Sequence, residues 1–166
     1  MKRLLVTLIL IIPMLVMAQD NSPIDKLFNK YANKDGFTTV NISGKLLSLA
    51  NSFADSKDDE IEMLNKISGI RVLSVDDSIM NTKLNFYKEL ESDGFFKNNK
   101  YEVLMEVTEK NSIVRFYGRS GPNHKLSELL LVVGGSSNTL ISIRGVINPD
   151  DIGKLTGSLN MGIKTK

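Results

Sequence analysis

The chain has 166 residues, of which 42% are apolar and 24% are charged, and its formal net charge is +2. This composition is typical of a globular domain and excludes a wholly disordered chain. The sequence contains no cysteine, which excludes disulfides, thiol nucleophiles and thiolate-bound zinc or iron–sulfur sites.

Residues 1–18 have the pattern of a secretory signal peptide. Lys2 and Arg3 precede an apolar run over residues 4–18, and Ala18 stands directly before Gln19. That run is shorter than the roughly 20 residues that a membrane-spanning helix needs. We therefore predict a signal peptide over residues 1–18 and a single α+β domain over residues 19–166, with no membrane span after cleavage.

The predicted product is periplasmic or secreted. Gln19 stands where the bacterial lipoprotein route requires a cysteine, so the sequence offers no lipid anchor. Cleavage removes Lys2 and Arg3 from the 21 basic residues, which leaves 19 basic residues against 19 acidic ones. A neutral exported chain has no net field that would collect nucleic acid, so we expect no nucleic-acid partner.

The first half of the predicted domain alternates helices with short strands. Ser22 is expected to cap a first helix, with Pro23 at its first position, Asp25 in its first turn and Gly36 at its end. The pattern then predicts a strand over residues 37–42, helices with apolar stripes over residues 46–53 and 61–67, a buried strand over residues 70–75, and one longer helix opened by residues 76–78 and stopped by residues 93–94.

After Gly94 the apolar period changes from 3.6 to 2. Alternation predicts four strands joined by short loops, which is the pattern of an antiparallel meander: residues 101–108, 113–118, 126–133 and 139–146. Residues 129–133 are apolar without alternation, so that strand is expected to be central and covered on both faces. A last short helix is expected to carry Ile152, Leu155 and Leu159.

These elements predict an α+β fold. Its sheet is an antiparallel four-stranded meander plus one or two N-terminal strands, with the helices packed on one face.

Three features that resemble catalytic or metal sites are better explained by local structure. His124 is the only histidine and lies in a Gly-Pro-Asn turn, whereas zinc without cysteine usually needs several imidazoles. Acidic residues at 58–60, 76–77 and 150–151 each stand at a predicted helix start, where negative charge is favoured. Residues 134–137 lack the Lys-Ser/Thr ending of a phosphate loop and predict a hairpin turn. We predict no catalytic residue, metal ligand or cofactor.

The candidate binding residues are Arg115, Tyr117 and Arg119, which share one face of a single predicted strand. Arg and Tyr on a solvated sheet face resemble single-strand nucleic-acid platforms, and they also resemble protein-binding patches. An ordinary solvated strand face has the same composition. Predicted export makes the nucleic-acid interpretation the weakest of the three.

The chain resembles the domain of unknown function 4252 family of exported proteins from Gram-negative bacteria. The resemblance rests on FTTVNIS at 37–43, I-x-x-L-x-x-I-S-G-I-R-V-L at 61–73, F-Y-x-E-L at 86–90, Y-E-V-L-M at 101–105, and the segment from L-L-L-V-V-G-G to S-I-R-G at 129–145. These are core and turn residues, so the resemblance implies a fold. It implies no catalytic residues.

The sequence therefore favours an exported, non-enzymatic domain that binds another cell-envelope protein. Two alternatives remain open. A small periplasmic hydrolase using carboxylates alone would need two carboxylates about 5–10 Å apart with no helix N-terminus behind them. A carrier of a small apolar ligand would need an internal apolar cavity of several hundred Å3.

Overall fold

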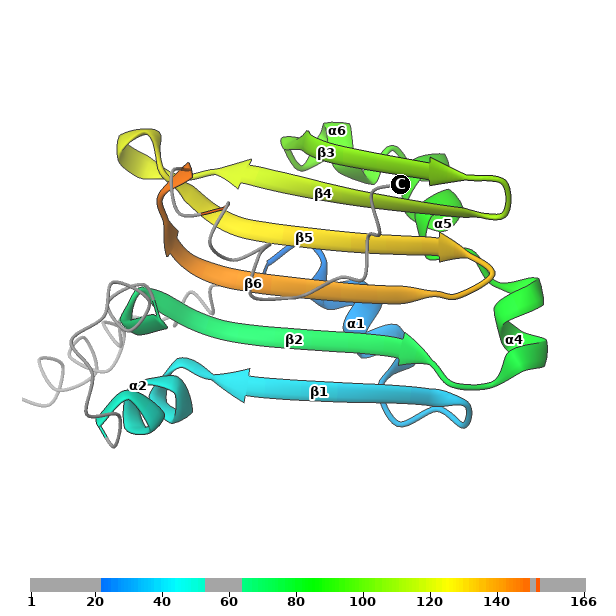
Figure 1. Cartoon of the computed structure of the whole chain (residues 1–166), viewed down its shortest axis with the longest axis horizontal. Coiled ribbons are helices and arrows are strands. Elements are labelled where there is room, and N and C mark those ends of the chain that lie inside the picture. The colour runs from blue at the N-terminus through cyan, green and yellow to red at the C-terminus, as the bar shows by residue number, and fades with distance from the viewer. Residues whose placement is uncertain (1–21, 53–63, 150–151, 153–166) are drawn as a thin grey trace, which may run out of the picture.

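The computed structural model describes residues 22–52, 64–149 and 152, so the predicted signal peptide lies outside the described residues. Its strands are β1 (Phe37–Ser43), β2 (Ile67–Val75), β3 (Tyr101–Glu109), β4 (Ser112–Ser120), β5 (Leu126–Gly135) and β6 (Thr139–Ile147). They form a six-stranded sheet in the order β1-β2-β6-β5-β4-β3, and all neighbouring strands are antiparallel (Figure 1). The predicted α+β class is confirmed.

Strands β3 to β6 follow one another both in the chain and across the sheet, as a meander does. The apolar run of β5 lies between β4 and β6 and is buried on both faces, as its sequence predicts. Leu130 and Val132 are fully buried on one face, and Leu129 and Leu131 are only 4% and 6% exposed on the other.

The described helices are α1 (Asp25–Tyr31), α2 (Gly44–Ser52), α4 (Ser78–Lys83), α5 (Phe86–Ser92) and α6 (Phe95–Asn98). In Figure 1, α1, α5 and α6 lie behind the sheet. The main core fills the space between these helices and the sheet, with Phe28, Phe86 and Leu140 at its fully buried centre. None of the helices in the described ranges is long and apolar enough to cross a membrane.

A smaller apolar cluster lies on the opposite face of the sheet. It contains Ile67, Leu129 and Ile147, and Leu47 of α2 and Ile152 pack against it. The prediction of helices on one face therefore holds for α1, α5 and α6, whereas α2 contacts the other face.

The predicted helix over residues 61–67 is wrong at its end, because Ile67 begins β2. Pairing with β6 extends this strand past Gly69 to Ile67, which lies opposite Gly145. Gly145 has a φ of +158°, and a Cβ there would lie 2.2 Å from the backbone oxygen of Lys66. Only glycine permits this close approach of the two strands. Residues 53–63, and with them the acidic cluster at 58–60, lie outside the described residues.

The single long helix predicted between residues 76 and 94 is also wrong. Leu84 and Asn85 adopt extended backbone angles and separate α4 from α5. Asn85 caps α5 by accepting a hydrogen bond from the Lys88 backbone at 3.0 Å. The predicted stop is confirmed, since Gly94 has a left-handed φ of +64°.

Candidate functional site

Tyr117 is buried, so the expectation that Arg115, Tyr117 and Arg119 form a solvated face is wrong. The three residues do alternate on one face of β4, but that face carries α5 and α6. Tyr117 is 1% exposed, and its ring stacks on Phe96 of α6 with 4.0 Å between ring centroids. The aromatic pair Phe95–Phe96 covers this face of β4, and the periodicity of the strand alone does not predict that cover.

Arg115 ties β4 to its neighbours in the sheet and in the helical layer. It forms an ion pair with Glu106 of β3, and its guanidinium lies 4.4 Å from the ring centroid of Tyr87 in α5. It also donates to the hydroxyl of Tyr117 at 3.3 Å. Burial raises the pKa of Tyr87 to about 12, so this phenol is neutral beside the arginine at physiological pH. These contacts give Arg115 a structural role.

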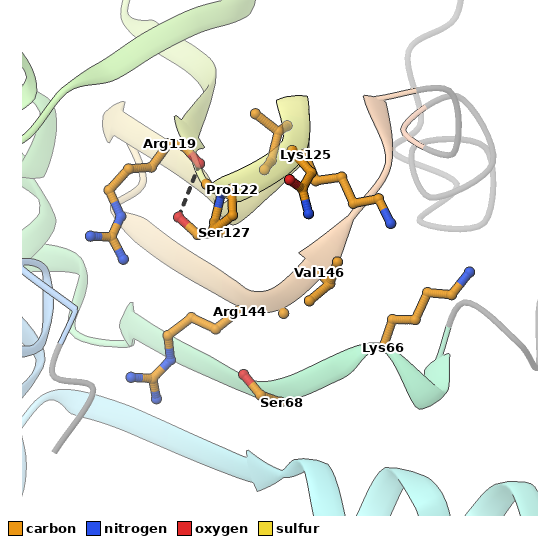
Figure 2. Close-up of a pocket in the computed structure, with 12 residues that line it drawn as sticks. Lys66, Ser68, Arg119, Pro122, Lys125, Ser127, Arg144 and Val146 are labelled. Atoms are coloured by element: carbon orange, nitrogen blue, oxygen red, sulfur yellow. Dashed lines mark hydrogen bonds between the residues drawn. The ribbon is translucent and has the colours of Figure 1, made fainter. Parts of the chain in front are cut away.

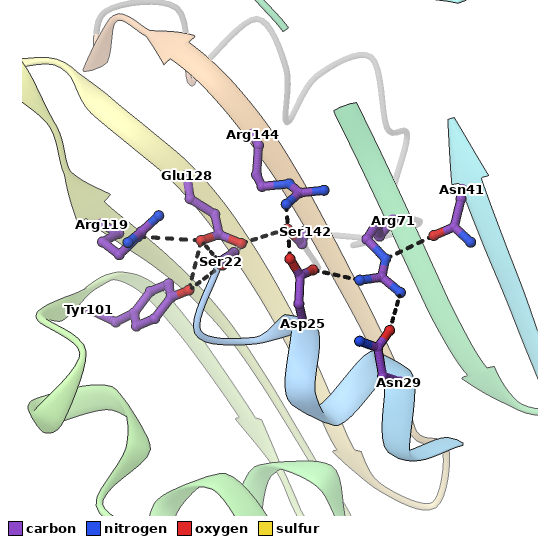
Figure 3. A network of polar contacts seen from close by, with 10 residues as sticks. All are labelled: Ser22, Asp25, Asn29, Asn41, Arg71, Tyr101, Arg119, Glu128, Ser142 and Arg144. Carbon is purple, nitrogen blue, oxygen red and sulfur yellow. Dashed lines mark hydrogen bonds and ion pairs between the residues drawn. The ribbon is translucent and has the colours of Figure 1, made fainter. Parts of the chain in front are cut away.

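Arg119 lies beside a buried carboxylate that belongs to β5. Glu128 is fully buried, and its Oε2 lies 3.4 Å from Nε of Arg119. Three hydroxyl groups also donate to Glu128: Ser22 at 2.5 Å, Ser142 at 2.6 Å and Tyr101 at 2.7 Å (Figure 3). Both oxygens of this carboxylate are therefore engaged by donors, as a buried charge requires.

The hydroxyl of Ser22 does not cap the first helix as predicted. Ile24 is the N-cap residue of α1 and provides no side-chain hydrogen bond, whereas Ser22 turns its hydroxyl to Glu128. Burial and the negative charge of Glu128 raise the pKa of Tyr101 above its ordinary value. Tyr101 therefore stays protonated and keeps donating its hydrogen bond.

A second carboxylate, Asp25 in the first turn of α1, holds two further arginines. Its Oδ1 lies 2.5 Å from Arg71 of β2, and its Oδ2 lies 3.1 Å from Arg144 of β6. Asn29 and Asn41 also accept hydrogen bonds from Arg71, at 3.2 and 2.8 Å. Figure 3 shows both groups of contacts: Asp25 joins α1 to β2 and β6, and Glu128 of β5 contacts Arg119 of β4 and Ser22, which precedes α1.

A basic cavity of about 420 Å3 adjoins this network. It lies where the turn between β4 and β5 meets the start of β2 and the end of β6, and Arg119 and Arg144 line it together with Lys66 and Lys125. Among the described residues that line it there is no carboxylate, and Ser68 and Ser127 add hydroxyl groups. Figure 2 shows the two guanidinium groups on one side and the two ammonium groups on the other.

The turn between β4 and β5 gives this cavity its shape. Residues Asn123 and His124 both have left-handed φ angles, 57° and 58°. Gly121 donates its backbone hydrogen bond to Lys125 at 2.8 Å, and Ser127 donates its hydroxyl to the Arg119 backbone at 3.1 Å (Figure 2). His124 is exposed in this turn, in agreement with the turn geometry predicted for it.

The arrangement suits binding of an anion more than it suits proton transfer. Arg119 and Arg144 line the cavity and are each held by a carboxylate on the other side, Glu128 or Asp25. The guanidinium groups are thus positioned before any ligand arrives, which lowers the entropy cost of binding. Both carboxylates are already engaged by arginines, and a general base needs a free lone pair aimed at its substrate.

The other acidic candidates have local roles where the structure describes them. Asp77 caps α4 by accepting from the Met80 backbone at 2.8 Å, as predicted. Asp76 accepts a hydrogen bond from Ser74 at 3.2 Å. The pair at 150–151 lies outside the described residues, and within the described part of the chain no group of three His, Asp or Glu side chains could hold a metal ion.

Sequence reasoning missed Glu128 and its partners. The available signal was a charged residue directly before the apolar run of β5, and Ser142 and Arg144 alternating with isoleucines in β6. These residues come together only because β4, β5 and β6 pair in one register, with Glu128 opposite both Arg119 and Arg144.

A family comparison covers most of this architecture. The model of the family described as Domain of unknown function (DUF4252) matches residues 31–155. The chain belongs to this family. The match includes Arg119, Lys125, Glu128 and Arg144, whereas Ser22 and Asp25 precede it. No curated protein and no solved structure gave a significant match.

Proposed function

We propose that this member of the DUF4252 family is an exported, non-enzymatic domain that binds an acidic group of another cell-envelope protein in the basic cavity. The observation that carries the proposal is the pairing of Arg119, which lines the cavity, with the buried carboxylate of Glu128 behind it. Lys125 adds an exposed positive charge at the rim.

The buried carboxylates behind the arginines and the exposed lysine at the rim affect binding in different ways. The buried carboxylates fix the direction of the arginines, so an incoming carboxylate or phosphate meets a preformed set of donors. The rim lysine acts at longer range and speeds the encounter with an acidic partner, an effect that salt weakens. Such a cavity favours an acidic partner over a basic or apolar one.

Neither alternative function has comparable support. Among the described residues, the most deeply buried carboxylates are Asp25 and Glu128, and Asp25 lies at the start of α1, in the position that a carboxylate-only hydrolase should avoid. A carrier of apolar ligands needs an apolar cavity, whereas four cationic side chains line this one beside Pro122, Leu126 and Val146.

Reversal of the rim charge tests the binding site. The tagged chain is cross-linked in the envelope of its native host, and the partners that co-purify are identified by mass spectrometry. Lys125→Glu is expected to reduce recovery of an acidic partner several-fold. Lys110→Glu, an equivalent change at an exposed lysine in the turn between β3 and β4, should leave recovery unchanged. Equal partner lists from both variants and the native chain would contradict the proposal.

Export is tested separately by cell fractionation and N-terminal sequencing. The leader pattern predicts a soluble chain that begins at Gln19. A chain that retains Met1 would refute export without bearing on the basic cavity.

A further inference from the structure

One row of side chains crosses the whole sheet on the face opposite α1, α5 and α6. Strand register places in this row one residue from each strand, and every member is apolar: Val40, Val72, Ile141, Leu131, Phe116 and Met105. We call these six residues the apolar row. The neighbouring row on the helix-covered face includes Asn41, Arg71 and Ser142 and is partly polar.

The centre of the apolar row is more deeply buried than its edge. Leu131 and Phe116 are each 6% exposed, whereas Val40 at the edge of the sheet is 42% exposed. In Figure 1 this face is toward the viewer, and the described helices lie behind the sheet or at its ends. A continuous apolar surface of this kind needs a cover, because soluble proteins rarely leave one open to water.

Ile152 shows which part of the chain reaches this face. It follows the end of β6 and packs against the cluster of Ile67, Leu129 and Ile147. Leu129 belongs to this cluster, and Ile143 packs against it. On their strands, these two residues lie two positions from Leu131 and Ile141, and therefore beside the apolar row. Ile152, the last described residue, therefore lies on the same face as the apolar row.

The sequence after Ile152 has the length and pattern to cross the row. Leu155 and Leu159 follow Ile152 at helical spacing, with Lys154 and Ser158 between them. As a helix, residues 153–166 would extend about 21 Å at 1.5 Å per residue. Six strands spaced about 4.8 Å apart span about 24 Å from first to last.

We propose that residues 153–166 dock on the apolar row and complete the second layer of the domain, with Leu155 and Leu159 against the sheet. The occupant of this face is then the chain's own C-terminal segment. This inference does not rest on the basic cavity, because no residue of the apolar row lines that cavity.

Introduced cysteine pairs test the docking directly, because the chain has no cysteine of its own. Leu155→Cys is combined with Val72→Cys or with Ile141→Cys in the full chain. The matched control combines Leu155→Cys with Val103→Cys, a half-exposed valine that pairs with Tyr117 and so belongs to the other face. Disulfides are formed at low protein concentration and mapped by mass spectrometry.

An intramolecular disulfide to residue 72 or 141, and none to residue 103, is the expected result. A disulfide that forms only between two molecules would assign the row to a second copy and overturn the proposal. Free, reactive thiols in every pair, or equal bonding to residue 103, would also overturn it. As a second measurement, Leu155→Asp with Leu159→Asp should raise binding of a hydrophobic dye several-fold over Lys154→Asp with Ser158→Asp.

Discussion

At the scale of single residues, Glu128 is the common partner of several polar side chains from different segments of the chain. Its two oxygens accept from hydroxyl groups on three separate segments, and its charge lies beside Arg119. In a fully buried position such a carboxylate is costly unless each neighbour contributes a donor. The same contacts make Glu128 a positioning residue for the basic cavity, because Arg119 lines that cavity from the other side.

Removing this carboxylate should destabilise the domain. Glu128→Ala leaves Arg119 without its counter-charge and three hydroxyl donors without their acceptor, so we expect a loss of about 3 kcal/mol in the free energy of unfolding. Urea denaturation followed by circular dichroism measures it. Glu102→Ala, at an exposed position of β3, should change stability by less than about 0.5 kcal/mol. Similar effects of the two substitutions would refute the assigned role.

At the scale of elements, Asn138 links the last hairpin to the junction of α4 and α5. It is 1% exposed, and its side chain accepts from the Phe86 backbone at 2.9 Å and donates to the Leu84 backbone at 3.0 Å. The amide thus satisfies backbone groups that the break between the helices leaves without helical partners. The break is a consequence of this tertiary contact as well as of the Asn85 cap.

Asn138→Ala should therefore loosen the junction of the two helices. Two buried backbone groups lose their partners, and we expect a cost of about 2 kcal/mol. Hydrogen exchange measured by mass spectrometry should accelerate over residues 84–88. The neighbouring substitution Ser137→Ala is exposed and serves as the control. Unchanged exchange over this segment in Asn138→Ala would show that Asn85 alone sets the junction.

At the scale of the whole molecule, all four tyrosines take part in the packing of the helices on the sheet. Burial is the largest cause that raises the pKa of each of them: Tyr31, Tyr87, Tyr101 and Tyr117. In the unfolded chain a phenol ionises near pH 10. The folded domain therefore binds more protons than the unfolded chain above that pH, and its stability falls as pH rises.

Alkaline titration should show this linkage. The stability contributed by neutral Tyr87 is complete below about pH 10 and is lost as pH rises toward its folded pKa of about 12. Phenolate absorbance should therefore appear together with the loss of tertiary circular dichroism. Phenolate that titrates near pH 10 while the fold stays intact would contradict the buried placement of these rings.

The strands could be predicted from the sequence because their signal is local. The alternation in 101–108 and the unbroken apolar run in 129–133 are each visible in the residues of that strand alone. The helices were harder, since α4, α5 and α6 are short and their ends depend on Asn85, Asn138 and Gly94. The apolar periodicity of the sequence continues through such breaks, so by itself it predicts one long helix where the structure has separate short ones.

The candidate site likewise combines features that follow from local sequence with features that depend on tertiary contacts. The sequence by itself determined the α+β class, the meander, the central place of β5 and the shared face of Arg115, Tyr117 and Arg119. Only the tertiary structure decided that helices cover this face and that Glu128, Ser22, Ser142 and Asp25 meet there. Secondary structure follows from neighbours along the chain, whereas a buried polar network depends on strand register and on contacts between residues as distant as 22 and 128.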